Sequence, residues 1–493
     1  MPNNYQSVHH YMEASQKAFE IYQHSTLQQR ATLLHQIGDS IQQISSTLIE
    51  VAATETHLSH KRLLTEIKRT IFQLQNYGDY CATGEWMDIR IDTHNTSDQQ
   101  HLIPDLRKMM VPLGPVLVFG AANFPFAYST AGGDTASGLA AGCSVVVKAH
   151  PGHVETGKLV AAAVREAIKI CNLPEDIFIH IEDISVETGE ALVKHPLTKA
   201  VGFTGSYKGG KQIFDWGNQR EIPIPVFAEM SSVNPVFILP EKLAIDGAHI
   251  AQKLAASITL DVGQFCTNPG IIVCVNDEAY NNFETLLVTE CKKVTPQTML
   301  NKGIGLNFKD KKQQMLQEQT VTTLIDNSNE TEAAVTIAKT TAQAFLANIA
   351  LQDEVFGPFS LMVCCKNIDE MQAVAQHLKG QLTATIFTTD AGFEQHPTLM
   401  QQIKNLAGRI IFNNVPTGVT VCLAMQHGGP FPSSTDSRFT SVGADGMKRF
   451  ARPQTYQNWP NALLPKELQN ENPLGIFRTV NNVLTKAAIT PYL

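Results

Sequence analysis

Short apolar runs alternate with helix-like stretches from Pro115 onward, and this alternation constrains the fold more than any other feature of the chain. The runs are PVLVFG, SVVVK, IFIHIE, KAVGFT and IPVFAE, separated by segments with helical character. Strands that alternate with helices at this spacing form a parallel sheet with helices on both faces. A second unit of the same kind begins near Pro240, includes a helix over 245–260 and continues to about residue 432. The sequence therefore predicts an α/β protein.

Polar residues follow the ends of four predicted strands. Asn123 comes after PVLVFG, Lys148 ends SVVVK, Gly205-Ser206 follow KAVGFT and Glu229 ends IPVFAE. In parallel sheets ligands bind beyond the carboxyl ends of the strands. Ser206 opens a helix, whose first-turn N–H groups favour an anion such as phosphate. No G-x-G-x-x-G fingerprint occurs, so a dinucleotide would be held in a different way.

One cysteine lies in a segment suited to nucleophilic chemistry. The stretch ITLDVGQFCTNPGII, residues 258–272, places Cys266 between Gly263 and the turn-forming Asn268-Pro269-Gly270. We expect Cys266 where a helix ends and a loop leads into a strand, with its main-chain N–H free to meet a ligand. A thiol placed in this way becomes a nucleophile where the thiolate is favoured. The alternative is a small buried hydrophobic residue.

Composition excludes several classes of partner. The 493 residues carry a net charge of −8, which offers no electrostatic footprint for nucleic acid. The nine cysteines are dispersed without a C-x-x-C pair, so neither a disulfide framework nor a zinc site is indicated, and no metal is expected. No apolar run approaches the length of a membrane span, and the start lacks signal-peptide character. We expect a cytoplasmic protein.

Motifs in a fixed order carry a family resemblance. They are AANFPF, VVVKAHP, GFTGSYKGG, AEMSSVNP, GQFCTNPG, EVFGPF and MQHGGPFP. Together they resemble the aldehyde dehydrogenase superfamily over essentially the whole chain. The stretches AYSTAGGDTASGLAAG, AEMSSVNPVF and HGGPFPSSTDSR look most similar to the branch of 2-oxoglutarate semialdehyde (2,5-dioxopentanoate) dehydrogenases and NADP-dependent fatty aldehyde dehydrogenases.

The resemblance implies an α/β fold with two open parallel-sheet domains and a β-ribbon for oligomerisation. The implied division is a nucleotide-binding domain, residues 1–96 and 115–240; a catalytic domain, residues 241–432; an oligomerisation ribbon and tail, residues 97–114 and 453–493; and a returning segment, residues 433–452. By the same resemblance the protein is a homodimer or a dimer of dimers.

The resemblance also implies catalytic roles. Cys266 would be the nucleophile that adds to an aldehyde carbonyl, and Asn123 with the Cys266 main-chain N–H would form the oxyanion hole. Glu229 would be the general base that hydrolyses the resulting thioester, a role suited to a carboxylate whose pKa is raised by burial. The alternative for Glu229 is a structural carboxylate in a salt bridge. His427 is a possible active-site residue or else a structural histidine.

An NAD or NADP site follows from the same resemblance. Its residues would be Lys148 at the adenine ribose, Gly205, Ser206 and Gly210 around the pyrophosphate, Glu354 at the nicotinamide ribose and Phe356 near the nicotinamide. Ordinary core packing is the alternative for Phe356. Pro151 stands where many NAD-preferring relatives have a glutamate that repels the 2′-phosphate of NADP. Glu182 and Asp183 near the next strand end weaken phosphate binding, so the preference stays open.

The implied activity is NAD(P)-dependent oxidation of an aldehyde to a carboxylate, most closely that of 2,5-dioxopentanoate to 2-oxoglutarate. A medium- or long-chain fatty aldehyde is the alternative substrate, and the mostly apolar residues 415–424 are candidates for the substrate pocket. Two other classes remain open: a cofactor-independent thiol esterase, and a non-catalytic structural protein on the same scaffold.

Overall fold

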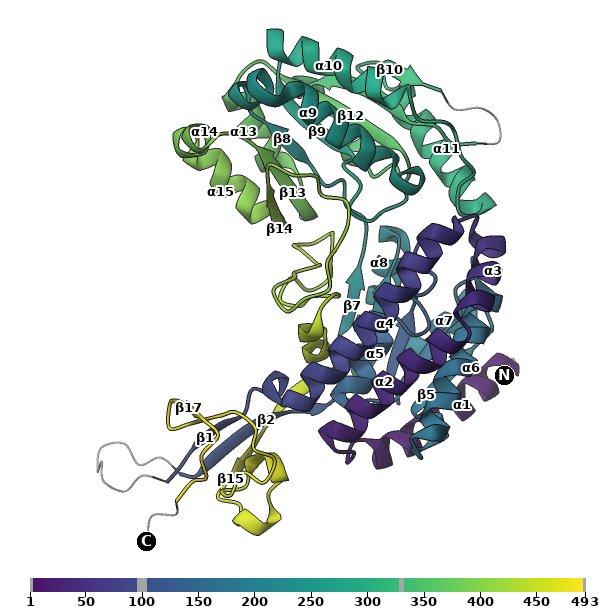
Figure 1. The fold of residues 1–493 in the computed structure, drawn as a ribbon, viewed down its shortest axis with the longest axis vertical. Coiled ribbons are helices and arrows are strands. Elements are labelled where there is room, and N and C mark those ends of the chain that lie inside the picture. Colours follow the sequence, from purple (N-terminus) through teal and green to yellow (C-terminus); the bar gives the residue numbers. More distant parts are fainter. Residues whose placement is uncertain (1–2, 95–103, 328–331, 491–493) are drawn as a thin grey trace.

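The structure, a computed structural model, describes residues 3–94, 104–327 and 332–490. Two bodies of sheet and helix lie one above the other, and a smaller third sheet projects from the lower body (Figure 1). The lower body contains a parallel five-stranded sheet in the order β5-β4-β3-β6-β7, as the sequence predicts. Its strands are β3 (Val116–Phe119), β4 (Val145–Lys148), β5 (Phe178–Ile181), β6 (Ala200–Thr204) and β7 (Val226–Glu229).

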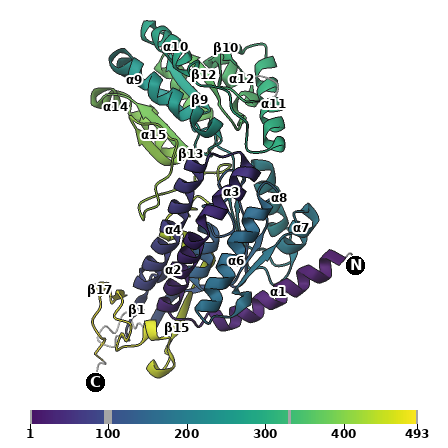
Figure 2. The same ribbon diagram turned by 45° about the vertical axis from the view of Figure 1, so that its right-hand side comes forward.

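Alternate residues of the first sheet pack on opposite faces because strand side chains alternate. Val116 and Val145 face one core, whereas Leu117 and Val146 face another. Figure 2 shows the helices of the first face. That face is covered by α2 (Leu27–Gln43), α3 (Ser45–Thr56), α4 (His60–Thr83), α5 (Gly133–Ala141) and α6 (Val154–Ile170), and the other by α1 (Asn3–Tyr22), α7 (Val186–Lys194) and α8 (Tyr207–Asn218).

The upper body contains a seven-stranded sheet in the order β10-β11-β12-β9-β8-β13-β14. All neighbouring strands are parallel except β10, which pairs antiparallel with β11 at the edge, so this open sheet is mixed. The strands are β8 (Val236–Ile238), β9 (Ile271–Val275), β10 (Thr322–Asp326), β11 (Thr336–Thr341), β12 (Phe359–Cys365), β13 (Gln381–Phe387) and β14 (Ala407–Phe412). β8 joins this sheet ahead of residue 240.

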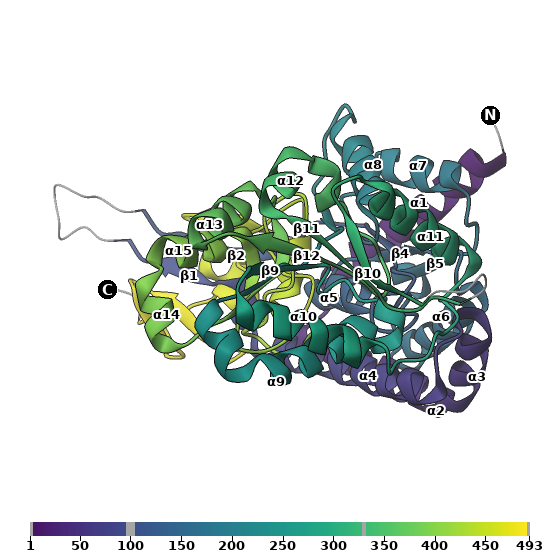
Figure 3. The same ribbon diagram turned by 90° about the horizontal axis from the view of Figure 1, so that it is seen from above.

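Helices cover both faces of the second sheet, as Figure 3 shows from above. On one face lie α9 (Pro240–Thr259) and α10 (Glu278–Cys291), and on the other α11 (Lys302–Gln317), α12 (Ala342–Ala347), α13 (Ile368–His377) and α15 (Pro397–Leu406), with the short α14 (Asp390–Gln395) beside α15. Helix α9 begins five residues before the predicted start at Ile245, because Pro240 is suited to the first helical position.

The third sheet joins distant parts of the chain in the order β15-β2-β1-β16-β17. Its strands are β1 (Arg90–Asp92), β2 (Leu106–Pro112), β15 (Ala451–Gln457), β16 (Arg478–Val480) and β17 (Val483–Thr485). Residues 97–103 of the predicted ribbon lie outside the described residues, as do residues 491–493 of the predicted tail. Across the described parts of the chain, no helix is long and apolar enough to cross a membrane.

We expect Gly263→Ala to lower the thermal unfolding midpoint. Gly263 has a φ of +62°, and a Cβ there would lie 2.5 Å from the carbonyl carbon and oxygen of Gly357. The strained backbone alone costs roughly 1–3 kcal/mol. Gly247→Ala in α9 is the matched control, because no atom lies within 4 Å of the added Cβ. That change should raise stability by about 0.5–1 kcal/mol. Equal midpoints for the two variants would contradict this account of the turn.

Candidate active site

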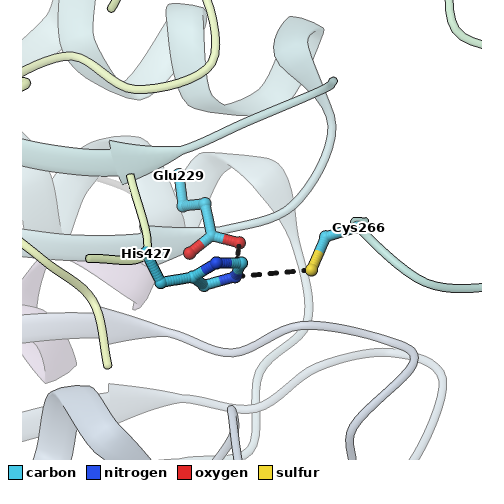
Figure 4. Close-up of side chains that lie close together, drawn as sticks. All are labelled: Glu229, Cys266 and His427. Atoms are coloured by element: carbon cyan, nitrogen blue, oxygen red, sulfur yellow. Dashed lines mark hydrogen bonds and ion pairs between the residues drawn. The ribbon is translucent and has the colours of Figure 1, made fainter. Parts of the chain in front are cut away.

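A thiol, an imidazole and a carboxylate meet in one place (Figure 4). The Sγ atom of Cys266 lies 3.4 Å from Nε2 of His427, and the same nitrogen lies 2.9 Å from Oε1 of Glu229. The side chains of His427 and Glu229 are 0% and 3% exposed, so bulk water does not screen their interaction. The structure therefore brings together the two side chains for which the sequence suggested chemistry and the histidine whose role it left open.

The loop that carries Cys266 is held by a buried asparagine. Helix α9 is followed by a turn in which Asp261 and Val262 have φ values of 45° and 60°. The side-chain amide of Asn234 donates to the carbonyl oxygens of Cys266 and Asn268, at 2.8 and 2.9 Å. These bonds satisfy main-chain carbonyls at the thiol residue and two residues after it, and thereby hold the loop in position.

Glu229 and His427 are fixed by the segment that returns from the second sheet to the first. The N–H of Met230 donates to the Ser433 carbonyl at 2.8 Å, which ties this segment to the end of β7. Ser441 connects the two functional side chains: its hydroxyl donates to Oε2 of Glu229, and its N–H donates to the His427 carbonyl at 2.8 Å. Ser441 therefore holds the carboxylate of Glu229 and the main chain of His427 together.

The pKa of Glu229 is shifted in the direction opposite to the one expected from its sequence context. Burial pushes its pKa upward, but the charge and hydrogen bond of His427 and the hydroxyl of Ser441 outweigh burial and lower the pKa below its usual range. The prediction that burial raises this pKa is therefore wrong. Glu229 is ionised at neutral pH and lies within contact distance of the imidazole.

The pKa of the Cys266 thiol moves in the opposite direction. Burial raises it well above its usual value, and the nearby carboxylate of Glu229 adds to this effect, while Arg69 and Arg409 oppose it. A thiol with a raised pKa is protonated at neutral pH and needs an acceptor for its proton before it can attack. The nearest nitrogen base is His427.

Asn123 reaches the thiol loop from the first sheet. Its side-chain amide donates to the carbonyl oxygen of Gln264 at 2.9 Å, two residues before Cys266. An amide nitrogen has two hydrogens, so this bond leaves a second donor.

The predicted cofactor residues of the first sheet lie at and after the end of β4, and between β6 and the first turn of α8. Lys148 ends β4 and is buried, and burial lowers its pKa while Asp183 opposes this. Ser206 caps α8, its hydroxyl accepting from the Gly209 N–H at 3.3 Å. Gly205 precedes it, and Pro151 is exposed in the turn after β4. A Cβ at Gly210 would lie 2.6 Å from Cγ of Met230, so this glycine permits α8 to pack closely beside β7.

Glu354 and Phe356 lie against the thiol loop. Both line a small cavity with Phe265 and Asn268, which flank Cys266 in sequence. Burial raises the pKa of Glu354 to about 7, although the hydroxyl of Ser231 and a main-chain N–H oppose this. The structure thus brings these residues within reach of the thiol loop.

Sequence reasoning missed several charged residues near the site. Arg69 on α4 donates to the Tyr128 hydroxyl at 3.1 Å, and Arg409 on β14 donates to the carbonyl oxygens of Pro416 and Gly418. Each arginine looks like an ordinary exposed charge in its own segment, so the sequence carried no signal for it. Lys158 on α6 lies 3.3 Å from Glu182, in contact with one of the two acids expected to repel a phosphate.

Comparisons with known proteins agree with the resemblance. A sequence model of the "Aldehyde dehydrogenase family" matches residues 3–456. An alpha-ketoglutaric semialdehyde dehydrogenase from Acinetobacter baylyi is 42% identical over 96% of this chain and 90% of its own length. An alpha-ketoglutaric semialdehyde dehydrogenase 2 from Azospirillum brasilense is also 42% identical, over 94% of this chain and 89% of its own.

Solved structures show the same fold. A betaine aldehyde dehydrogenase from Staphylococcus aureus superposes with a TM-score of 0.77 at 17% identity, over 94% of this chain and 89% of that one. A methylmalonate-semialdehyde dehydrogenase from Oceanimonas doudoroffii gives a TM-score of 0.77 at 17% identity, over 92% and 91%. The predicted fold class is confirmed, and the chain belongs to the aldehyde dehydrogenase family of oxidoreductases.

Proposed function

We propose that this protein oxidises 2-oxoglutarate semialdehyde (2,5-dioxopentanoate) to 2-oxoglutarate with NAD or NADP. The contact of Cys266, His427 and Glu229 carries the proposal, because it supplies a nucleophile, a proton acceptor and a carboxylate in one buried place. The substrate follows from the 42% identity to two alpha-ketoglutaric semialdehyde dehydrogenases over most of the chain.

The first step is attack by the thiol. For the attack, His427 changes from the tautomer that donates its Nε2 hydrogen to Glu229 to the tautomer with its hydrogen on Nδ1, and Nε2 then takes the proton of Cys266. Glu229 stabilises the imidazolium that forms, since its oxygen lies 2.9 Å from the same nitrogen. Arg69 and Arg409 favour the thiolate by attraction. The sulfur then bonds to the aldehyde carbon, and the carbonyl oxygen becomes an oxyanion.

Two donors stabilise the oxyanion. They are the second hydrogen of the Asn123 amide and the main-chain N–H of Cys266, each contributing about 3 kcal/mol when well placed. A nicotinamide held at this site would supply the acceptor for the hydride of the substrate carbon, and Cys266 would then carry the product as a thioester. Glu229 then removes a proton from water, which attacks the thioester and releases the carboxylate product.

The residues present fit a nicotinamide dinucleotide. A buried ammonium at the end of β4, a helix N-terminus capped by Ser206 and a half-buried carboxyl group at Glu354 match ribose hydroxyls, a pyrophosphate and a second ribose. We propose that Lys148, Ser206 and Glu354 hold these groups, with Gly205 and Pro151 beside them. Gly210 supports the same helix, and Phe356 packs near the nicotinamide.

The charges near the thiol favour an anionic substrate over a fatty aldehyde. Arg69 and Arg409 lie close enough to Cys266 to lower its pKa. Arg409 also holds part of the candidate pocket segment 415–424 through Pro416 and Gly418. These two half-buried guanidinium groups make hydrogen bonds within the protein, and their positive charge suits the carboxylate of a dioxo acid better than an uncharged alkyl chain.

The division into domains and the assembly remain proposals. We propose a nucleotide-binding domain over residues 1–96 and 115–240, a catalytic domain over 241–432, and assembly into a dimer or dimer of dimers. Support for assembly comes from exposed apolar side chains on the third sheet and its tail, including Leu463, Val483 and Leu484. All nine cysteines are free, which fits the reducing cytoplasm.

A substrate panel tests the proposed function. We expect kcat/KM for 2,5-dioxopentanoate to exceed that for hexanal by at least about 100-fold, because an alkyl aldehyde leaves buried polar groups unpaired. Succinate semialdehyde and glutaraldehyde test which chain length, and which group at the end distant from the aldehyde, the substrate pocket accepts. Cys266→Ala should abolish nucleotide reduction with every substrate. A preference for hexanal, or undiminished activity without the thiol, would contradict the proposal.

We expect His427→Gln to move the acid limb of thioester hydrolysis to higher pH. His427 lowers the pKa of Glu229 against burial, so removing the imidazole leaves burial to raise it, and the carboxylate becomes protonated at a higher pH. Single-turnover decay of the acyl-enzyme between pH 5 and 9 measures this. His377→Gln at the exposed end of α13 is the control and should leave the profile in place. An unmoved limb in His427→Gln would show that this histidine does not set the ionisation of Glu229.

We expect initial rates with NAD and NADP to lie within roughly tenfold of each other at low salt. Lys158 pairs with Glu182, and Asp183 is occupied by the Thr188 hydroxyl and the Ser185 N–H, so the repulsion of a phosphate is moderated. Lys158→Met should shift the ratio several-fold toward NAD, whereas Lys169→Met at the end of the same helix should not. A large preference for NADP in the parent protein would contradict a role for these acids.

A further inference from the structure

The three side chains of the active site are also a set of zinc ligands. One ligand atom each from Glu229, Cys266 and His427 lies within 4.8 Å of the other two. Thiolate, imidazole and carboxylate are the three groups that bind zinc in proteins. We propose that this cluster binds one zinc ion and that the ion inhibits the enzyme reversibly.

The distances between the three ligand atoms are close to those around a bound zinc ion. Tetrahedral zinc with ordinary bond lengths separates its ligand atoms by about 3.3–3.6 Å. In the structure Sγ of Cys266 lies 3.4 Å from Nε2 of His427, and that nitrogen lies 2.9 Å from Oε1 of Glu229. The remaining pair, Sγ of Cys266 and the Glu229 oxygen, lies within 4.8 Å, so all three atoms are near enough to share one ion.

Outer contacts hold the ligands in this arrangement. Ser441 bonds to Oε2 of Glu229, so Oε1 is the oxygen turned toward the cluster. The main-chain N–H of His427 is fixed by the Thr440 hydroxyl at 2.9 Å, and the Cys266 carbonyl is fixed by Asn234. Contacts of this kind orient the residues that bind a metal directly, and they strengthen its binding.

Charge balance favours zinc in this buried place. A thiolate and a carboxylate together neutralise a divalent ion, whereas the two anions alone repel each other. The thiol proton and any proton shared by His427 and Glu229 leave for solvent as the ion binds. No oxidant or reductant takes part.

Zinc held here would be exchangeable and inhibitory. Three protein ligands and one open position are typical of accessible zinc sites, and closed structural sites have four. The sulfur lone pair that attacks the aldehyde would be bound to the metal. The ligands come from three separate segments, so the local spacings that predict zinc sites from sequence are absent.

Direct titration of zinc chloride into the enzyme, without nucleotide or aldehyde, tests binding. We expect one zinc ion per chain, and affinity at least about 100-fold weaker in both Cys266→Ser and His427→Gln. Cys171→Ser, which removes a partly exposed thiol at the end of α6, is the matched control and should bind as the parent does. Thermal melting checks that each variant is folded. Equal zinc affinity in the parent and Cys266→Ser, or no binding to the parent, would overturn the proposal.

Activity gives a second, separate measurement. Stoichiometric zinc should abolish aldehyde oxidation, EDTA should restore it, and magnesium, which prefers oxygen ligands, should have no effect. Inhibition that persists after chelation would overturn reversible binding. The binding titration uses no substrate, so an enzyme inactive toward every aldehyde would refute the proposed function and leave the zinc result to be decided on its own.

Discussion

A buried contact between an imidazole and a carboxylate, 2.9 Å apart, is the interaction on which the active site depends. His427 and Glu229 are almost completely buried, and each would be costly there alone, because an unpaired buried charge destabilises a protein by roughly 3–5 kcal/mol. Ser441 satisfies the second carboxylate oxygen. The pair holds Glu229 ionised and places a base beside the thiol.

The arrangement of the sheets explains why this contact can form. Glu229 ends β7 of the first sheet, Cys266 lies in a loop leading into β9 of the second, and His427 belongs to the segment that runs from the second sheet back to the first. No single element contains the site. Hydrogen bonds such as that from the Met230 N–H to the Ser433 carbonyl attach this segment to the first sheet. The geometry of the site therefore depends on how both bodies pack.

Much of the fold was predictable from local pattern. The five apolar runs after Pro115 are the five strands of the first sheet, and Lys148 and Glu229 end their strands as predicted. Strand direction in the second sheet was not predictable at β10, because residue patterning does not distinguish an antiparallel edge strand from a parallel one. Helix α9 extends to Pro240 because a proline fits the first turn, which apolar periodicity does not detect.

The electrostatics of the site could not be predicted from the sequence. The pKa of Glu229 depends on His427, which lies far along the chain, and burial considered alone gives the wrong direction. Arg69 lies on α4, far from Cys266 in the sequence, and its effect on the thiol appears only when α4 is packed. Motifs identify which residues react, whereas protonation depends on contacts between distant segments.

The most direct measurement is mass spectrometry of the Glu229→Gln variant quenched during reaction with 2,5-dioxopentanoate and NAD. This substitution keeps the shape of the side chain and removes the base that hydrolyses the thioester. The account predicts an acyl group on the peptide that contains Cys266, approaching one per chain, with nucleotide reduced in equal amount. Continued product formation with Cys266 unmodified throughout would contradict it.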